Sequence, residues 1–146
     1  MVHSISMSRR RREKVKRAPY VVFVSHASTD LWIARVIAEK ISLPGIKPWL
    51  DEIDMEGGNV VVDDIIRGID SCNEAIILVS PSTVDSQWVV FEIGAVRGQH
   101  KRVTPILNNV HYDAIKPMSD VKAISLSEFD RFLMQLKKRV RSGARR

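Results

Sequence analysis

The chain has 146 residues, of which 45% are hydrophobic, so it can bury one core, and no long glycine-, serine- or proline-rich linker divides it. No stretch reaches the roughly 18 apolar residues of a transmembrane helix, and the start lacks the apolar core of a signal peptide. The single cysteine, Cys72, excludes an internal disulfide. We therefore expect one domain in the cytoplasm, with no membrane partner.

The net charge of +6 comes from the two ends of the chain. Residues 9–17 hold seven basic groups and one acid, and residues 137–146 hold six basic groups and no acid, which leaves 10 basic and 16 acidic residues in 18–136. This acidic body makes nucleic acid an unexpected partner of the folded domain. We expect residues 1–17 to be a basic disordered arm, 18–141 the folded domain and 142–146 a basic tail.

Short β-branched apolar runs alternate with helical patterns along the chain. The runs predict strands at 20–25, 46–50, 74–80, 103–107 and 122–126. The patterns between them predict helices at roughly 29–42, 59–71, 82–100 and 127–141, with an irregular link at 108–121. Ser28 is expected to cap the first helix, and Ser80 before Pro81 to cap the third. The series predicts a flavodoxin-like parallel sheet of five strands, in the order 2-1-3-4-5, with helices on both faces.

In such a sheet, ligands bind outside the carboxyl ends of the strands. Several functions are excluded because the chain lacks their motifs. It has no phosphate-binding loop, no dinucleotide-binding glycine pattern and no nucleophile elbow. Receiver domains need acidic residues where this chain has Ser25-His26 and Ser80-Pro81. The four histidines are scattered and there is one cysteine, so no metal site is expected.

Glu92 is the residue that most needs an explanation, because it interrupts the apolar helical stretch from Trp88 to Val96. Burial of an ionised carboxylate costs several kcal/mol, so a buried Glu92 would need a partner, a raised pKa or a catalytic task. The alternative is a Glu that points to solvent from a half-exposed helix.

Three segments, taken in order, resemble the Toll/interleukin-1 receptor (TIR) domain family over about residues 19–140. Tyr20–His26 is similar to its first strand, and Gly45–Asp51 to the strand before its long BB loop. Ser86–Glu92 is similar to the Ser-x-Trp-x-x-x-Glu stretch of its catalytically active members. Two features depart from the family: His26 stands where many relatives have tyrosine, and residues 51–59 lack the Arg-Asp and proline features of the receptor-adaptor branch.

The resemblance implies cleavage of the nicotinamide–ribose bond of NAD+, which is then a substrate, and no further cofactor is expected. Glu92 would be the catalytic carboxylate. One carboxylate can suffice because nicotinamide leaves as a neutral base and needs no proton. The residues that would line the NAD+ site are Ser25, His26, Trp49, Asp51 and Trp88. Core packing, capping or support of the loop remain alternatives for most of them.

The resemblance also implies self-assembly through TIR–TIR contacts and activation in trans by a partner protein, in immune or anti-phage defence. Capture of the ribose by water would give ADP-ribose, capture by an internal group would give a cyclic isomer, and capture by an external nucleophile would give a conjugate. The sequence leaves this choice open. Two other functions remain: a non-catalytic TIR docking module, and an enzyme similar to nucleoside deoxyribosyltransferases.

Overall fold

The computed structural model describes residues 18–50, 61–84, 87–114 and 121–143, with the backbone alone at 61–65 and 87–91. The predicted basic arm at 1–17 lies outside the described residues, as do Asp51, the acidic segment that follows it, and residues 144–146 of the predicted tail.

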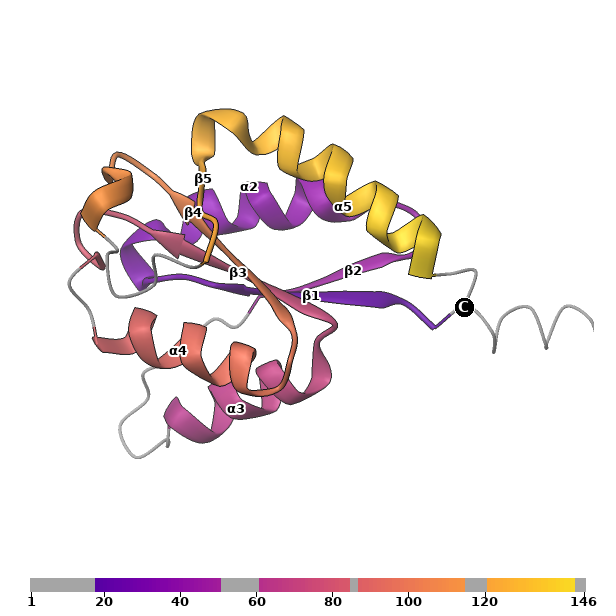
Figure 1. The fold of residues 1–146 in the computed structure, drawn as a ribbon, viewed down its shortest axis with the longest axis horizontal. Helices are drawn as coiled ribbons and strands as arrows, with labels where there is room; N and C mark the ends of the chain where they lie inside the picture. Colours follow the sequence, from indigo (N-terminus) through magenta and orange to yellow (C-terminus); the bar gives the residue numbers. More distant parts are fainter. Residues whose placement is uncertain (1–17, 51–60, 85–86, 115–120, 144–146) are drawn as a thin grey trace, which may run out of the picture.

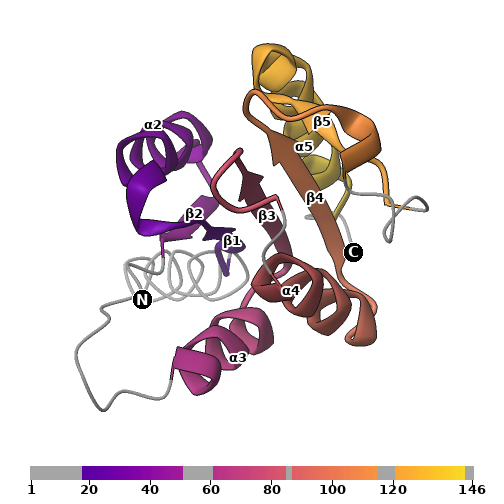
Figure 2. The same cartoon turned by 90° about the vertical axis from the view of Figure 1, so that its left-hand side faces the viewer.

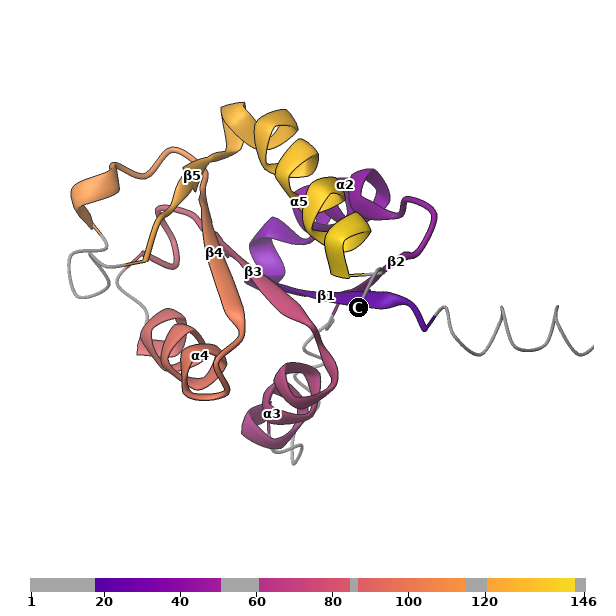
Figure 3. The same cartoon turned by 45° about the vertical axis from the view of Figure 1, so that its right-hand side comes forward.

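A parallel sheet of five strands organises the domain (Figure 1). Its strands lie in the order β2-β1-β3-β4-β5, as predicted, and Figure 3 shows β5 at the edge beside β4. The strands are β1 (Tyr20–Ser25), β2 (Ile46–Leu50), β3 (Glu74–Val79), β4 (Arg102–Leu107) and β5 (Ile124–Ser125). β5 is shorter than expected, because its pairing with β4 is limited to Ile124 beside Ile106 and Ser125 beside Leu107.

Helices cover both faces of the sheet (Figure 2). One face carries α2 (Leu31–Ile41) and α5 (Phe129–Gly143), and the other carries α3 (Val61–Ser71) and α4 (Gln87–Gly98). Two short 3-10 turns, η1 (Ser28–Asp30) and η3 (Leu126–Glu128), precede α2 and α5. The helices match the predicted number and order, but α5 continues to Gly143 rather than 141.

Alternation along β1 divides the core into two clusters. Val22 and Val24 belong to the cluster under α2 and α5, whereas Phe23 belongs to the cluster under α3 and α4. Each large side chain buried in this way contributes about 1.5–3 kcal/mol. Gly68 lets α3 approach Phe23 closely, because a Cβ atom at this position would lie 2.5 Å from Phe23 Cε2.

Both predicted serine caps are wrong. The turn Ser28–Asp30 precedes α2 without a side-chain cap at its start, and it is closed by the Asp30 N–H, which donates to the Ala27 carbonyl at 2.9 Å. α4 begins at Gln87 rather than 82. The Ser80 carbonyl instead accepts 2.9 Å hydrogen bonds from the N–H groups of Thr83 and Val84, which closes a separate turn before the helix.

The end of α4 is fixed by a Schellman motif. The N–H of Lys101 donates to the carbonyl of Val96 at 3.2 Å, and the N–H of His100 donates to that of Arg97 at 2.9 Å. This closure places His100 at a φ of 57°, a left-handed conformation that usually belongs to glycine. Lys101 Nζ then donates to the last carbonyls of α3, those of Ile69 and Asp70, at 2.6 and 2.9 Å.

A buried ion pair fastens α5 to the amino-terminal edge of the sheet. Arg139 donates two hydrogen bonds to the fully buried Glu74, Nε to Oε1 at 3.1 Å and Nη2 to Oε2 at 2.9 Å. The Tyr20 hydroxyl donates to Glu74 Oε1 at 2.7 Å. Burial and this bond raise the pKa of Tyr20 far above its ordinary value of 10.0. Arg139 also lies over the Phe132 ring, 5.7 Å from its centroid.

Candidate active site

The carboxyl ends of β1 and β3 form the topological switch point of the sheet. The two strands are neighbours, yet the chain passes from β1 to α2 on one face and from β3 to α4 on the other (Figure 2). In sheets of this kind, ligands bind at the edge where two such connections diverge. The predicted site residues should therefore lie near the switch point if they bind a ligand.

Glu92 is buried on α4, with 4% of its surface exposed. It is the sixth residue of the helix Gln87–Gly98, roughly 8 Å along the axis from its start. That start lies at the carboxyl edge, because the helix follows β3 and runs back along the sheet. The next residue, Ile93, belongs to the core cluster under α3 and α4. The half-exposed position that the sequence left open for Glu92 is thus excluded.

Ser25 and His26 close β1 at the same edge, and both are buried. Side chains alternate along a strand, so Ser25 lies on the same side of β1 as Phe23, which packs in the cluster under α3 and α4. Ser25 therefore shares with Glu92 one side of the sheet and one edge. His26 and Glu92 each have interaction partners within the structure.

Trp49 packs against the core of this same side. It lies beside Phe23 in the register of β2 with β1, and the two rings make an edge-to-face contact with centroids 5.8 Å apart. This packing gives Trp49 a structural task at the strand end. A contact between Trp49 and NAD+ stays a prediction.

Two predicted site residues cannot be placed by their side chains. Asp51, which follows β2, lies outside the described residues. Trp88 lies in the first turn of α4, four residues before Glu92, and only its backbone is described. The roles predicted for both residues remain predictions.

A network of hydroxyl groups and one carboxylate joins the two connections at the switch point. Ser80, directly after β3, donates its hydroxyl to the buried Asp30 carboxylate at 2.7 Å. Ser80 Oγ also lies 2.9 Å from Ser82 Oγ, and Thr83 Oγ1 accepts the Ser80 N–H at 2.9 Å. Thr29 Oγ1 lies 3.5 Å from Ser82 Oγ. The network ties the segment that continues from Ser25-His26 to the segment that leads to Glu92.

Sequence reasoning missed this network: it placed the segment from Ser80 at the ligand-binding edge, but it assigned Ser80 the role of a helix cap and gave it no partner in another segment. The available signal was the presence of short polar side chains after both neighbouring strands, at Ser28–Asp30 and Ser80–Thr83. Because the carboxyl ends of neighbouring parallel strands meet at one edge, such side chains can pair across it. Choosing Asp30 and Ser80 as the pair required the tertiary structure.

Two buried carboxylates in the described part of the chain lie near this edge: Asp30, which accepts the Ser80 hydroxyl, and Glu92 on α4. Among the described residues, no group of three or more His, Cys, Asp or Glu side chains is placed to hold a metal ion. No helix in the described ranges has the length and apolar character needed to cross a bilayer. A carboxylate held at low dielectric acts strongly on positive charge that develops beside it and can accept hydrogen bonds from sugar hydroxyls.

Curated proteins similar to this chain include, by name, a cyclic ADP-ribose synthase and an NAD+ hydrolase. The 2′ cyclic ADP-D-ribose synthase BtTIR of Bacteroides thetaiotaomicron is 30% identical over 113 residues, which cover 74% of this chain and 39% of that protein. The NAD(+) hydrolase TcpC of Escherichia coli is 26% identical over 132 residues, which cover 80% of this chain and 43% of that protein. The chain thus spans about two fifths of the length of these relatives.

A solved structure supports the fold. The TIR domain of the Toll-related receptor TRR-2 from Hydra magnipapillata superposes with a TM-score of 0.60 at 21% identity, over 82% of this chain and 97% of that one. The family model described as TIR domain matches residues 22–138, which include Glu92 and all five strands except the first two residues of β1. The chain belongs to the TIR domain family.

Proposed function

We propose that this domain cleaves the nicotinamide–ribose bond of NAD+, with Glu92 as the catalytic carboxylate. The observation that carries the proposal is the burial of Glu92 beside the switch-point edge that Ser25 and His26 also reach. The names of BtTIR and TcpC support the same activity. A buried carboxylate costs several kcal/mol, and this catalytic task explains why the chain retains it.

The proposed reaction needs one carboxylate. The bond between the ribose carbon and the pyridinium nitrogen breaks with its electron pair going to nitrogen, so nicotinamide leaves neutral and positive charge develops on the ribose. The negative Glu92 stabilises that charge and accepts hydrogen bonds from the ribose hydroxyls. A nucleophile then attacks the ribose carbon. Water would give ADP-ribose and a proton, whereas a hydroxyl of the same nucleotide would give a cyclic isomer.

We further propose that Ser25, His26, Trp49, Asp51 and Trp88 line the nucleotide site. Ser25 is the best supported of these, because it shares a side of the sheet and an edge with Glu92. NAD+ is the substrate in this proposal and no resident cofactor takes part.

Assembly through TIR–TIR contacts, triggered by a partner protein, is also part of the proposal. Trp32 and Val36 support it: they lie one turn apart on α2, and both are exposed, Trp32 by 69%. Exposed apolar side chains that share a helix face are typical of docking surfaces. The same observation favours a second candidate function, a docking module that works without catalysis.

The test is release of nicotinamide from NAD+ by the purified protein at high concentration, followed by chromatography. Glu92→Gln keeps the size of the side chain, and Glu39→Gln on the exposed face of α2 is the matched control for loss of one negative charge. We expect Glu92→Gln to lower the rate about 10²–10³-fold and Glu39→Gln to leave it unchanged.

Equal rates for the wild type and Glu92→Gln would refute the catalytic role of Glu92. No release from any variant, with a molecular crowder present to promote assembly, would favour the docking module.

A further inference from the structure

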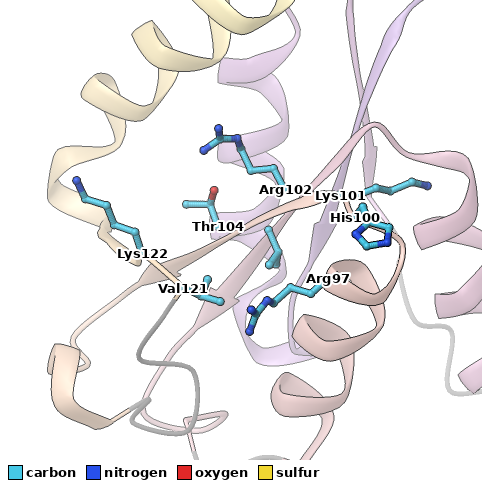
Figure 4. Close-up of a pocket in the computed structure, with 8 residues that line it drawn as sticks. Arg97, His100, Lys101, Arg102, Thr104, Val121 and Lys122 are labelled. Carbon is cyan, nitrogen blue, oxygen red and sulfur yellow. The ribbon is translucent and has the colours of Figure 1, made fainter.

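A shallow pocket of about 640 Å³ opens at the edge of the sheet between β4 and the segment that enters β5 (Figure 4). It exists because the described pairing of β5 with β4 is confined to the last two residues of β4, Ile106 and Leu107. The first half of β4, from Arg102 to Thr104, and residues Val121 and Lys122 line the opening.

Basic side chains gather at this pocket. Four of the ten Lys and Arg residues in 18–136 line it, namely Arg97, Lys101, Arg102 and Lys122, although the same range holds 16 acids. Within the described part of the chain, no acidic side chain lines the pocket. Clustered like charges repel each other, so this concentration in an acidic domain favours a bound anion.

Two of the four cations have structural tasks. Lys101 Nζ donates to the last carbonyls of α3, and Figure 4 shows its side chain pointing away from Arg102 and Lys122. Arg97 lies in the last turn of α4, where the helix dipole favours a positive charge. Within the described ranges, neither Arg102 nor Lys122 forms an ion pair.

Arg102, Thr104 and Lys122 point to the same side of the sheet (Figure 4). Arg102 and Thr104 are two residues apart on β4, a spacing that places both side chains on one face. Lys122 reaches the same side from the segment before β5, whereas Arg97 and Val121 lie on the other. A guanidinium fork, an ammonium group and a hydroxyl are therefore available to one ligand.

We propose that Arg102, Lys122 and Thr104 bind a phosphate-bearing anion. The guanidinium of Arg102 matches two phosphate oxygens at once, the ammonium of Lys122 supplies a second charge, and the Thr104 hydroxyl donates a further hydrogen bond. The pocket lies at the amino end of β4, opposite the carboxyl edge with Ser25 and Ser80. The proposal does not depend on cleavage of NAD+ by Glu92.

The test is calorimetric titration of the full chain with sodium pyrophosphate at constant ionic strength. The pocket variant is Arg102→Gln/Lys122→Gln, and the matched control is Lys40→Gln/Lys47→Gln, which removes the same charge from exposed positions on α2 and β2. We expect one saturable site in the wild type, an affinity about tenfold or more weaker in the pocket variant, and a change below about twofold in the control.

Amide chemical shifts of the wild type locate the ligand in the same titration. We expect the largest changes at Val103, Thr104 and Lys122, and the same changes in Glu92→Gln. Thr104→Val provides a second variant that keeps every charge, and we expect it to bind more weakly than the wild type. Three results would overturn the proposal. They are equal weakening of binding in the pocket variant and the control, absence of saturable binding, and chemical-shift changes confined to Ser25 and Ser80.

Discussion

Ser80 donates its hydroxyl to the buried carboxylate of Asp30 across 2.7 Å, and this contact joins the connection after β3 to the connection after β1. The residues are 50 positions apart in the sequence. β1 ends at Ser25 and the connection after it begins with His26, whereas the connection after β3 leads to α4 with Glu92. The contact therefore links the two segments of the chain that carry the candidate site residues.

Replacement of Asp30 by Ala should cost about 1–3 kcal/mol in the free energy of unfolding, because the Ser80 hydroxyl loses a charged acceptor inside the protein. Asp30→Asn keeps an acceptor for Ser80 and should cost less. Denaturation with urea measures both. If the proposed activity holds, Asp30→Ala should also lower kcat for nicotinamide release at temperatures where the variant is fully folded, and Asp30→Asn should restore part of it. Equal kcat in all three proteins would show that the contact only stabilises the fold.

Arg139→Ala should destabilise the domain by about 3 kcal/mol, because it leaves the fully buried Glu74 carboxylate without its cation. Arg141→Ala, two residues further along α5 and exposed, is the control and should change stability by less than about 0.5 kcal/mol. Urea denaturation again gives the values. Similar losses in the two variants would mean that the charge of α5, rather than the pair, supports the fold.

Tyr20 should make the stability of the domain sensitive to alkaline pH. Burial and the hydrogen bond to Glu74 raise its pKa in the folded state above the ordinary value of 10.0, so the unfolded chain loses this proton first. The stabilisation is thus fully present below about pH 10 and is lost as the pH rises from there toward the folded-state value. Melting temperatures between pH 8 and pH 11 of the wild type and Tyr20→Phe should converge as the pH rises. Parallel curves would contradict this role.

Gly68→Ala should destabilise the domain by about 1–3 kcal/mol, because the added methyl group collides with the Phe23 ring inside a packed core. Gly94→Ala is the matched control on α4, where a Cβ atom meets nothing within 4 Å. It should stabilise the helix by about 0.5–1 kcal/mol. Thermal melts of both variants measure these changes. An unchanged melting temperature in Gly68→Ala would show that α3 can move away from β1.

His100→Gly should raise the melting temperature, because glycine adopts the left-handed conformation of this position without the cost of about 1–2 kcal/mol that a Cβ atom brings. His100→Val should lower it, since a β-branched side chain suits this conformation least. If His100→Gly instead lowers the melting temperature, the side chain of His100 makes contacts worth more than its backbone strain.

The elements that the sequence predicted well are those set by local patterns. Runs such as Val21–Val24 and Ala75–Val79 are apolar on both faces, and only a parallel sheet covered on both sides buries them fully. Alternation of these runs with helices and the right-handedness of crossovers leave few topologies, and the order 2-1-3-4-5 is the one that flavodoxin-like sheets have. Glu92 could be singled out for the same reason, since a charge inside an apolar helical stretch is visible without a structure.

The helix starts and β5 were predicted less well, because they depend on contacts between distant segments. Ser80 has the local form of a helix cap, yet its hydroxyl bonds with Asp30 and its carbonyl closes a separate turn. A local rule cannot weigh a partner 50 residues away. β5 is short because the chain diverges from β4 before Ile124, and no pattern within 122–126 signals that divergence.

The sequence by itself determined the fold, the family resemblance and the candidate catalytic carboxylate, because hydrophobic periodicity and an anomalous charge are properties of neighbouring residues. The tertiary structure alone decided which polar groups meet: Ser80 with Asp30, Glu74 with Arg139 and Tyr20, and Arg102 with Lys122 at one pocket. These groups come from segments far apart in the chain, and they are brought together by burial of the apolar faces rather than by any preference of their own.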